Sequence, residues 1–112
     1  MARTVKRGDL VIVTAQGDHG KPRPAVVIQS DALNMADSVL VALLTTTISD
    51  APFYRLTVAP TEANGLKASS QIMIDKILAY RRFRCGAVIG RLASQDVLAL
   101  NNMLSVMIGL AD

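Results

Sequence analysis

The sequence is poor in the residues that most often carry enzyme chemistry. Among its 112 residues it has one cysteine, Cys85, one histidine, His19, and no tryptophan. A single cysteine excludes an intramolecular disulfide and fits a reducing compartment, so we expect a cytoplasmic protein. A single histidine excludes an acid–base pair of histidines within one chain. No Cys/His spacing, carboxylate cluster or glycine-rich phosphate loop occurs, so we predict no metal and no cofactor.

Long apolar runs are also missing. No apolar segment follows the start "MARTVKR", and no run reaches 18 residues, so we expect neither a signal peptide nor a membrane span. Hydrophobic residues still make up 51% of the chain, which favours one folded domain over residues 1–112 with an aliphatic core. The formal net charge is only +3, but basic residues gather in segments 3–7 and 76–91. Clustered arginine suits phosphate, and a solvated surface explains it equally well.

Short apolar segments separated by turn residues predict a mainly β protein. The predicted strands cover residues 8–14, 23–30, 39–46, 54–59 and 69–80, with a further small strand or turn within 81–92. We predict a turn at 16–22 and a loop with at most one helical turn at 31–38. Short connections favour antiparallel pairing, so we expect a strongly curved, mostly antiparallel sheet or β-barrel followed by a helix at 94–110.

The predicted helix carries apolar residues on more than one face. Ser94 is expected to cap its start, and Gly109 to end it. The face predicted to pack on the strands consists of Val97, Leu100, Leu104 and Met107. The apolar residues left without cover are Leu98, Met103, Val106 and Leu110. Because a helix that is apolar all round is buried all round, we predict a homodimer or a partner protein over this surface. Burial within one chain is the alternative.

The segment "GKPRPAVVIQSD" sets Arg23 between two prolines at the start of a predicted strand. A charge on a rigid backbone loses little entropy when it meets a phosphate. An arginine of the turn, tied to a carboxylate such as Asp18, is the alternative. RNA supplies its own nucleophile, the 2′-hydroxyl, so an enzyme that uses it needs neither a metal nor a protein nucleophile. The residues of this chain are compatible with that chemistry but do not select it.

Six segments occur in one order at compact spacing. They are "KRGDLVIV", "GKPRPAVVIQSD", "VALLTTT", "SSQIMIDKI", "IGRL" and "MIGL". Over residues 6–112 this ordered set resembles the MazF/PemK family of toxin–antitoxin endoribonucleases. The resemblance implies an SH3-like β-barrel with helices that works as a homodimer and binds a cognate antitoxin. It also implies metal-independent cleavage of single-stranded RNA, usually mRNA, to a 2′,3′-cyclic phosphate and a 5′-hydroxyl.

The same resemblance assigns roles to individual residues. The family's arginine of the "RP" strand start corresponds to Arg23, and its functional Ser/Thr corresponds to Thr45. Thr46 follows directly and could share the second role. Asp75 corresponds to an acidic position near the scissile phosphate, with an ion pair to Lys76 or Arg82 as the structural alternative. These matches make Arg23 and Thr45 the predicted catalytic residues.

Three further residues are candidates for RNA or antitoxin contacts. Arg82 and Arg84 lie in the basic segment after "IMIDKI", where family members bind RNA. His19 lies in the first loop, which is shorter than in many members and lacks their Glu-Gln pair. Both departures of this chain from the family pattern, in that loop and at Arg81, fall on the predicted RNA side. The sequence preference of the family therefore does not transfer.

Two other functions fit the same residues. The first is a non-enzymatic toxin of the CcdB type, which poisons DNA gyrase by binding and shares the barrel and the dimer. The second is a degenerate family member that only binds antitoxin or RNA. The CcdB type does not need an arginine at the strand start, and the degenerate member predicts no growth arrest on induction.

Overall fold

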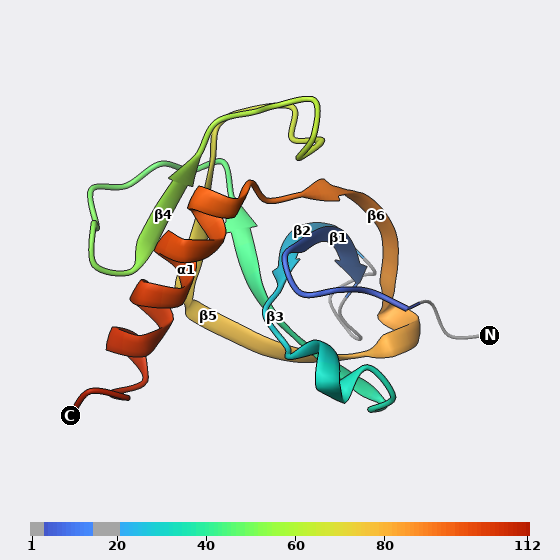
Figure 1. Ribbon diagram of the computed structural model, residues 1–112. Helices are drawn as coiled ribbons and strands as arrows, with labels where there is room; N and C mark the ends of the chain where they lie inside the picture. The colour runs from blue at the N-terminus through green and yellow to red at the C-terminus, as the bar shows by residue number, and fades with distance from the viewer. Residues whose placement is uncertain (1–3, 15–20) are drawn as a thin grey trace.

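The computed structural model describes residues 4–14 and 21–112 (Figure 1). It contains six strands, two short 3₁₀ turns (η1 and η2) and one α-helix. In chain order they are β1 (Asp9–Thr14), β2 (Pro22–Val27), η1 (Asp31–Leu33), β3 (Ser38–Thr45), β4 (Arg55–Val58), β5 (Ser70–Arg81), η2 (Arg82–Arg84), β6 (Cys85–Arg91) and α1 (Ser94–Met107). Each predicted strand is present, and the segment at 81–92 divides into η2 and a full strand.

All strands join one antiparallel sheet in the order β4-β5-β3-β2-β1-β6. The sheet curls around β1 and β2, as the ribbon shows (Figure 1). Its edges are β4 and β6, so the sheet is an open one and not a closed barrel. The predicted mainly β class with a C-terminal helix is confirmed. Runs of β-branched Val and Ile explain the strands, because such side chains pack well on a pleated surface.

Alternation along the strands produces a hydrophobic cluster on each face of the sheet. Leu10, Val26 and Ala42 lie in the cluster beneath α1, together with the fully buried Leu100 of the helix. The neighbouring residues of the same strands point the other way, into the concave side. That second cluster consists of Val5, Val11, Val13, Ala25, Val27, Val39, Val41, Tyr80 and Cys85. Since both faces are covered, the strands read as continuous apolar runs.

The helix packs across β4 and β5, and its apolar residues divide nearly as predicted. Val97, Leu100 and Leu104 face the sheet, and Met103 joins them. Met107 was predicted on this face but is exposed, because it lies in the last helical turn. Within the described residues, no helix is long and apolar enough to cross a membrane.

The two ends of the helix differ in how they are capped. Ser94 is the first helical residue, and Ala93 occupies the N-cap position without a side-chain hydrogen bond, so the predicted Ser94 cap is wrong. Gly109 has φ of +73°, and the amides of Gly109 and Leu110 donate to the carbonyl oxygens of Val106 and Ser105. This pattern ends the helix at the predicted glycine.

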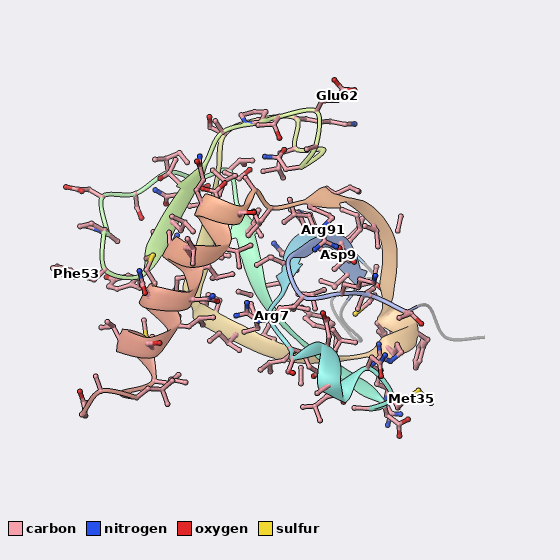
Figure 2. All side chains as sticks on the ribbon, viewed as in Figure 1. Arg7, Asp9, Met35, Phe53, Glu62 and Arg91 are labelled. Carbon is pink, nitrogen blue, oxygen red and sulfur yellow. The ribbon has the colours of Figure 1, made fainter. Side chains whose placement is uncertain are left out.

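An ion pair joins the start of β1 to the end of β6. Arg91 Nη1 lies 2.7 Å from Asp9 Oδ1, and the two side chains meet in Figure 2. The other carboxylate oxygen of Asp9 accepts the Lys6 amide at 2.9 Å. Asp9 is buried whereas the Arg91 side chain is more than half exposed, so the pair links the two strands at the surface of the sheet.

Candidate active site

Arg23 and Thr45 lie just beyond the paired region of two neighbouring strands. The β2–β3 pairs run from Val27–Val41 to Ala25–Leu43, and Arg23 and Thr45 each lie two residues beyond the last pair on their own strand. Thr45 in turn pairs with Gln71 of β5. Arg23, Thr45 and Gln71 therefore occupy neighbouring strands, and opposite residues of antiparallel strands share one face of a sheet. The two residues predicted to be catalytic therefore come from adjacent strands, at the same end of the paired β2–β3 region.

Arg23 is an exposed residue near the start of β2, whereas the strand is buried from Ala25 onward. Pro24 follows it in the strand, so its φ-restricted ring stiffens the backbone at this point. Val13 of β1 pairs with Arg23 on the other side. The arginine is therefore carried by backbone that pairs with β1.

The Thr45 hydroxyl is oriented by its own loop. Thr45 ends β3, and its Oγ1 accepts the Thr47 amide at 3.1 Å. A hydroxyl that accepts one hydrogen bond keeps its own hydrogen for donation. Thr45 is partly exposed, so this hydrogen is able to reach a phosphate oxygen. Thr46 is exposed beside it.

Gln71 is a polar residue of the site that the sequence analysis did not single out. It is only 4% exposed. Its Oε1 accepts the Ser49 amide at 3.1 Å, and its Nε2 donates to the Ser49 carbonyl oxygen at 3.0 Å. Nε2 also lies 3.1 Å from Thr57 Oγ1. The sequence signal that could have identified it is a glutamine inside the apolar run "SSQIMIDKI", because a buried amide side chain requires specific hydrogen-bond partners.

Asp75 lies in an irregular part of β5. Ala42 pairs with Ile77 but Leu44 pairs with Ile72, so the register shifts across Asp75. Its carboxylate lies 3.9 Å from Arg55 Nε and 3.8 Å from Lys76 Nζ. Lys76 was one of the predicted ion-pair partners, and Arg55 was not foreseen. At these distances and with a partly exposed carboxylate, the pairs contribute little to stability.

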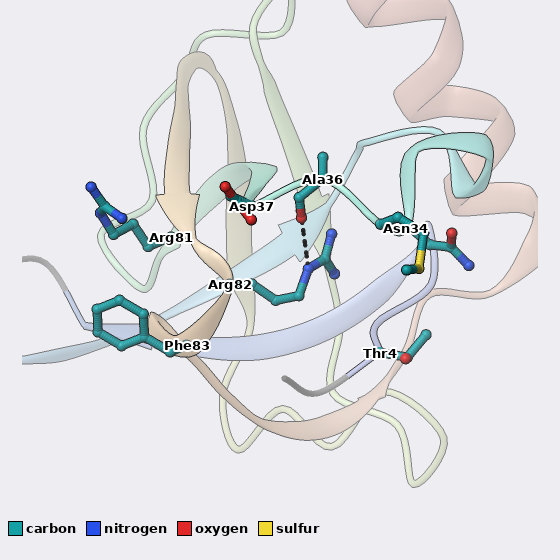
Figure 3. A pocket seen from close by; sticks show the side chains of 8 residues that line it. Thr4, Asn34, Ala36, Asp37, Arg81, Arg82 and Phe83 are labelled. Carbon is teal, nitrogen blue, oxygen red and sulfur yellow. Dashed lines mark hydrogen bonds between the residues drawn. The ribbon is translucent and has the colours of Figure 1, made fainter. Parts of the chain in front are cut away.

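Arg82 is buried, which its charged neighbourhood in the sequence did not indicate. It is 8% exposed, and its Nε donates to the Ala36 carbonyl oxygen at 2.9 Å (Figure 3). Its backbone amide donates to the Asp37 carbonyl oxygen at 2.8 Å. Arg82 therefore ties the segment after η1 to the end of β5. It also lines a cavity of about 510 Å³ together with Thr4, Asn34, Met35, Ala36, Asp37, Arg81 and Phe83.

This cavity lies away from Thr45. Arg81 pairs with Ser38 at the start of β3, and Thr45 ends the same strand. Seven residue steps of extended chain separate the two ends, which is about 23 Å. The structure therefore does not bring Arg82 next to Arg23 and Thr45.

Arg84 lies closer to the predicted catalytic pair. Cys85, its neighbour in the chain, pairs with Val13, the residue that also pairs with Arg23. Two strand spacings, about 10 Å, therefore separate this position from Arg23. The guanidinium carbon of Arg84 lies 5.2 Å from the centre of the exposed Phe83 ring. A cation over an exposed ring forms a surface on which a base can stack.

The buried thiol of Cys85 is not suited to nucleophilic attack. Burial raises the pKa of the Cys85 thiol above its ordinary value, and the Arg82 guanidinium lowers it by less. Thiolates, not thiols, are the nucleophiles. Residues 4–14 and 21–112 contain no cluster of three metal-ligating side chains. His19 lies outside the described residues.

Solved structures match this fold closely. An endoribonuclease from Mycobacterial species, in complex with its cognate antitoxin, superimposes with a TM-score of 0.80 at 20% identity, covering 95% of this chain and 96% of that one. A MazE–MazF structure from Deinococcus radiodurans gives 0.76 at 17% identity, covering 96% and 97%. At such identities these matches define the fold: that of the MazF toxins.

Sequence comparison adds the family. The model of the "PemK-like, MazF-like toxin of type II toxin-antitoxin system" matches residues 6–108. A protein described as "Probable endoribonuclease MazF", from Mycolicibacterium smegmatis, is 39% identical over 96% of this chain and 99% of its own length. The chain therefore belongs to the PemK/MazF family of type II toxins, which confirms the predicted resemblance.

Proposed function

We propose that the chain is the endoribonuclease toxin of a type II toxin–antitoxin system and cuts single-stranded RNA, with mRNA as its cellular target. Its family and its similarity to a probable endoribonuclease over nearly the whole chain support this function. The observation that carries it is that Arg23 and Thr45 lie at the same end of the paired β2–β3 region, each two residues beyond the last pair. An exposed guanidinium beside a hydroxyl donor is an arrangement that suits a phosphate.

The proposed reaction uses the RNA's own 2′-hydroxyl. Its oxygen attacks the adjacent phosphorus, the bond to the 5′-oxygen breaks, and the hydroxyl proton is lost to solvent as the leaving oxygen gains one. The products are a 2′,3′-cyclic phosphate and a 5′-hydroxyl. Arg23 stabilises the charge on the phosphate oxygens, and the Thr45 hydroxyl donates to one of them. No step requires a metal. Asp75 and Arg84 are secondary candidates for RNA contacts.

Two protein partners complete the proposal. An antitoxin is expected because the family is one of type II toxins, and the similar Mycobacterial endoribonuclease was solved with its cognate antitoxin. A second copy of the chain is expected over the outer face of α1. That face exposes Leu98 and Val106, and the chain beyond it exposes Ile108 and Leu110. Exposed apolar residues this close together are typical of an interaction site.

Metal-free digestion of single-stranded RNA tests the function. We expect the unmodified protein to cut RNA in EDTA and to leave 5′-hydroxyl ends. Arg23→Ala should lower kcat/KM by roughly 10²–10³-fold, as loss of one transition-state donor does. The urea midpoint of Arg23→Ala, measured beside that of wild type, separates a loss of catalysis from a loss of folding. RNA that stays intact under EDTA, with Arg23→Ala indistinguishable from wild type, would sink the proposal. Capture of gyrase without RNA cleavage would favour the CcdB-type alternative.

A further inference from the structure

The segment 46–54, between β3 and β4, begins directly after Thr45. Its far end is fixed by backbone bonds: the Tyr54 amide donates to the Ala51 carbonyl oxygen, and the Ile74 amide donates to the Tyr54 carbonyl oxygen. The near end depends on side chains. Gln71 binds both the amide and the carbonyl oxygen of Ser49. The glutamine side chain thus takes the place that a neighbouring strand's backbone would have.

The backbone of the segment connects the Ser49 anchor to the candidate catalytic hydroxyl. Gln71 fixes Ser49, and Ser49 lies two residues beyond Thr47. The Thr47 amide donates to Thr45 Oγ1 at 3.1 Å. If Ser49 is released, the Thr47 amide is free to shift, and the Thr45 hydroxyl loses the hydrogen bond that orients it.

We propose that Gln71 is a positioning residue for RNA cleavage, acting on Thr45 through Ser49 and Thr47. The proposal rests on the function proposed above. Gln71 is buried and does not touch the phosphate itself; it holds the loop that orients the hydroxyl. A displacement of about 1 Å in a catalytic group can cost on the order of 10²-fold in rate.

Only a side chain that donates and accepts at once can make this contact. Leucine retains the approximate volume of glutamine but makes neither bond. An ionised glutamate accepts from the Ser49 amide but repels its carbonyl oxygen. A protonated glutamate has both a donor and an acceptor, so it reproduces the glutamine pattern. Burial raises a carboxyl pKa toward neutrality, which makes the protonated form accessible at mildly acidic pH.

Three variants of the full chain test the role: Gln71→Leu, Gln71→Glu and, as the matched control, Thr57→Val. The control removes the third partner of Gln71 but leaves both bonds to Ser49. We expect Gln71→Leu to lower kcat by roughly 10–100-fold with KM changed by less than about threefold, because a transition-state contact is lost. Gln71→Glu should regain activity relative to wild type as the pH is lowered. Thr57→Val should stay within about twofold of wild type, although it also leaves a buried donor unpaired.

Amide hydrogen exchange gives a readout that does not depend on RNA. In Gln71→Leu, the amides of residues 47–49 should exchange at least tenfold faster than in wild type, whereas in Thr57→Val they should not. Unchanged exchange in Gln71→Leu overturns the positioning role, and so does an equal loss of activity in Thr57→Val. If wild type cleaves no RNA, the proposed function fails instead, and the exchange data still report whether Gln71 anchors the loop.

Discussion

The outer face of α1 allows a quantitative prediction about self-association. Leu98 is 65% and Val106 is 73% exposed in the single chain, although the same helix buries Leu100 completely. Full burial of such a side chain stabilises by about 1.5–3 kcal/mol, so covering the exposed part yields about 1–2 kcal/mol. A two-fold symmetric interface contains each residue twice. Leu98→Ser or Val106→Ser should therefore weaken the dimer by about 2–4 kcal/mol.

That loss corresponds to a dissociation constant raised by roughly 30–1,000-fold, since each 1.4 kcal/mol is a factor of ten. Sedimentation equilibrium over a range of concentrations measures it. Met35→Ser is the matched control, because Met35 is 91% exposed and follows η1, away from α1 (Figure 2). The urea midpoints of all three monomers should stay close to wild type. A monomeric wild type, or two helix variants that dimerise as tightly as the control, would refute the reasoning.

Three further substitutions test the fold around the site. Gly65→Ala should lower the free energy of unfolding in urea by about 2–4 kcal/mol, because φ is +70° and a Cβ would meet the Ile89 carbonyl oxygen; a loss below about 1 kcal/mol contradicts this. Asp9→Asn should cost about 0.5–1 kcal/mol in the same assay by removing the partner charge of the half-exposed Arg91, and an unchanged midpoint argues against the ion pair. Cys85 retains its proton longer when folded, so its contribution to stability is complete below its ordinary pKa of 9.0 and is lost as the pH rises through the higher folded pKa. Thermal melts of Cys85→Ala should therefore decline less steeply above pH 9 than those of wild type, and parallel curves would contradict the raised pKa.

The strands could be predicted because their information is local. Residues 9–14, 22–27 and 38–45 are rich in β-branched and aliphatic side chains and end at turn residues. The irregular register of β5 is not local: it arises because the strand pairs with β3 along most of its length and with β4 near its start. The pattern of apolar residues within "SSQIMIDKILAYR" does not indicate that the strand pairs with two different neighbours. The register shift across Asp75, and the ion pair with Arg55, were therefore beyond sequence reasoning.

The candidate site shows the same division. Arg23 and Thr45 could be chosen from the sequence because the family resemblance assigned them, but that their strands are neighbours follows from the sheet topology alone. Gln71 was missed because the sequence around a single polar residue in an apolar strand does not show which residue it will bind. Arg82 and Arg84 belong to one basic segment and were predicted together. They differ because η2 turns the Arg82 side chain inward toward Ala36, whereas Arg84 lies over the exposed Phe83 ring.

Burial also separates the residues that hold the site from those able to meet RNA. Across β5, β3 and β2, exposure rises from buried Gln71 through partly exposed Thr45 to exposed Arg23. An RNA substrate can contact only the exposed residues of the three. Their contacts stabilise the transition state best when the buried residues that support them are held rigidly. Arg82 has the opposite arrangement, since its guanidinium is itself the buried, supporting group. The proposed phosphate contact is therefore better assigned to Arg23 than to Arg82, although both arginines lie near a strand end. Substitution of Arg82 should first destabilise the loop after η1, which its side chain binds at Ala36.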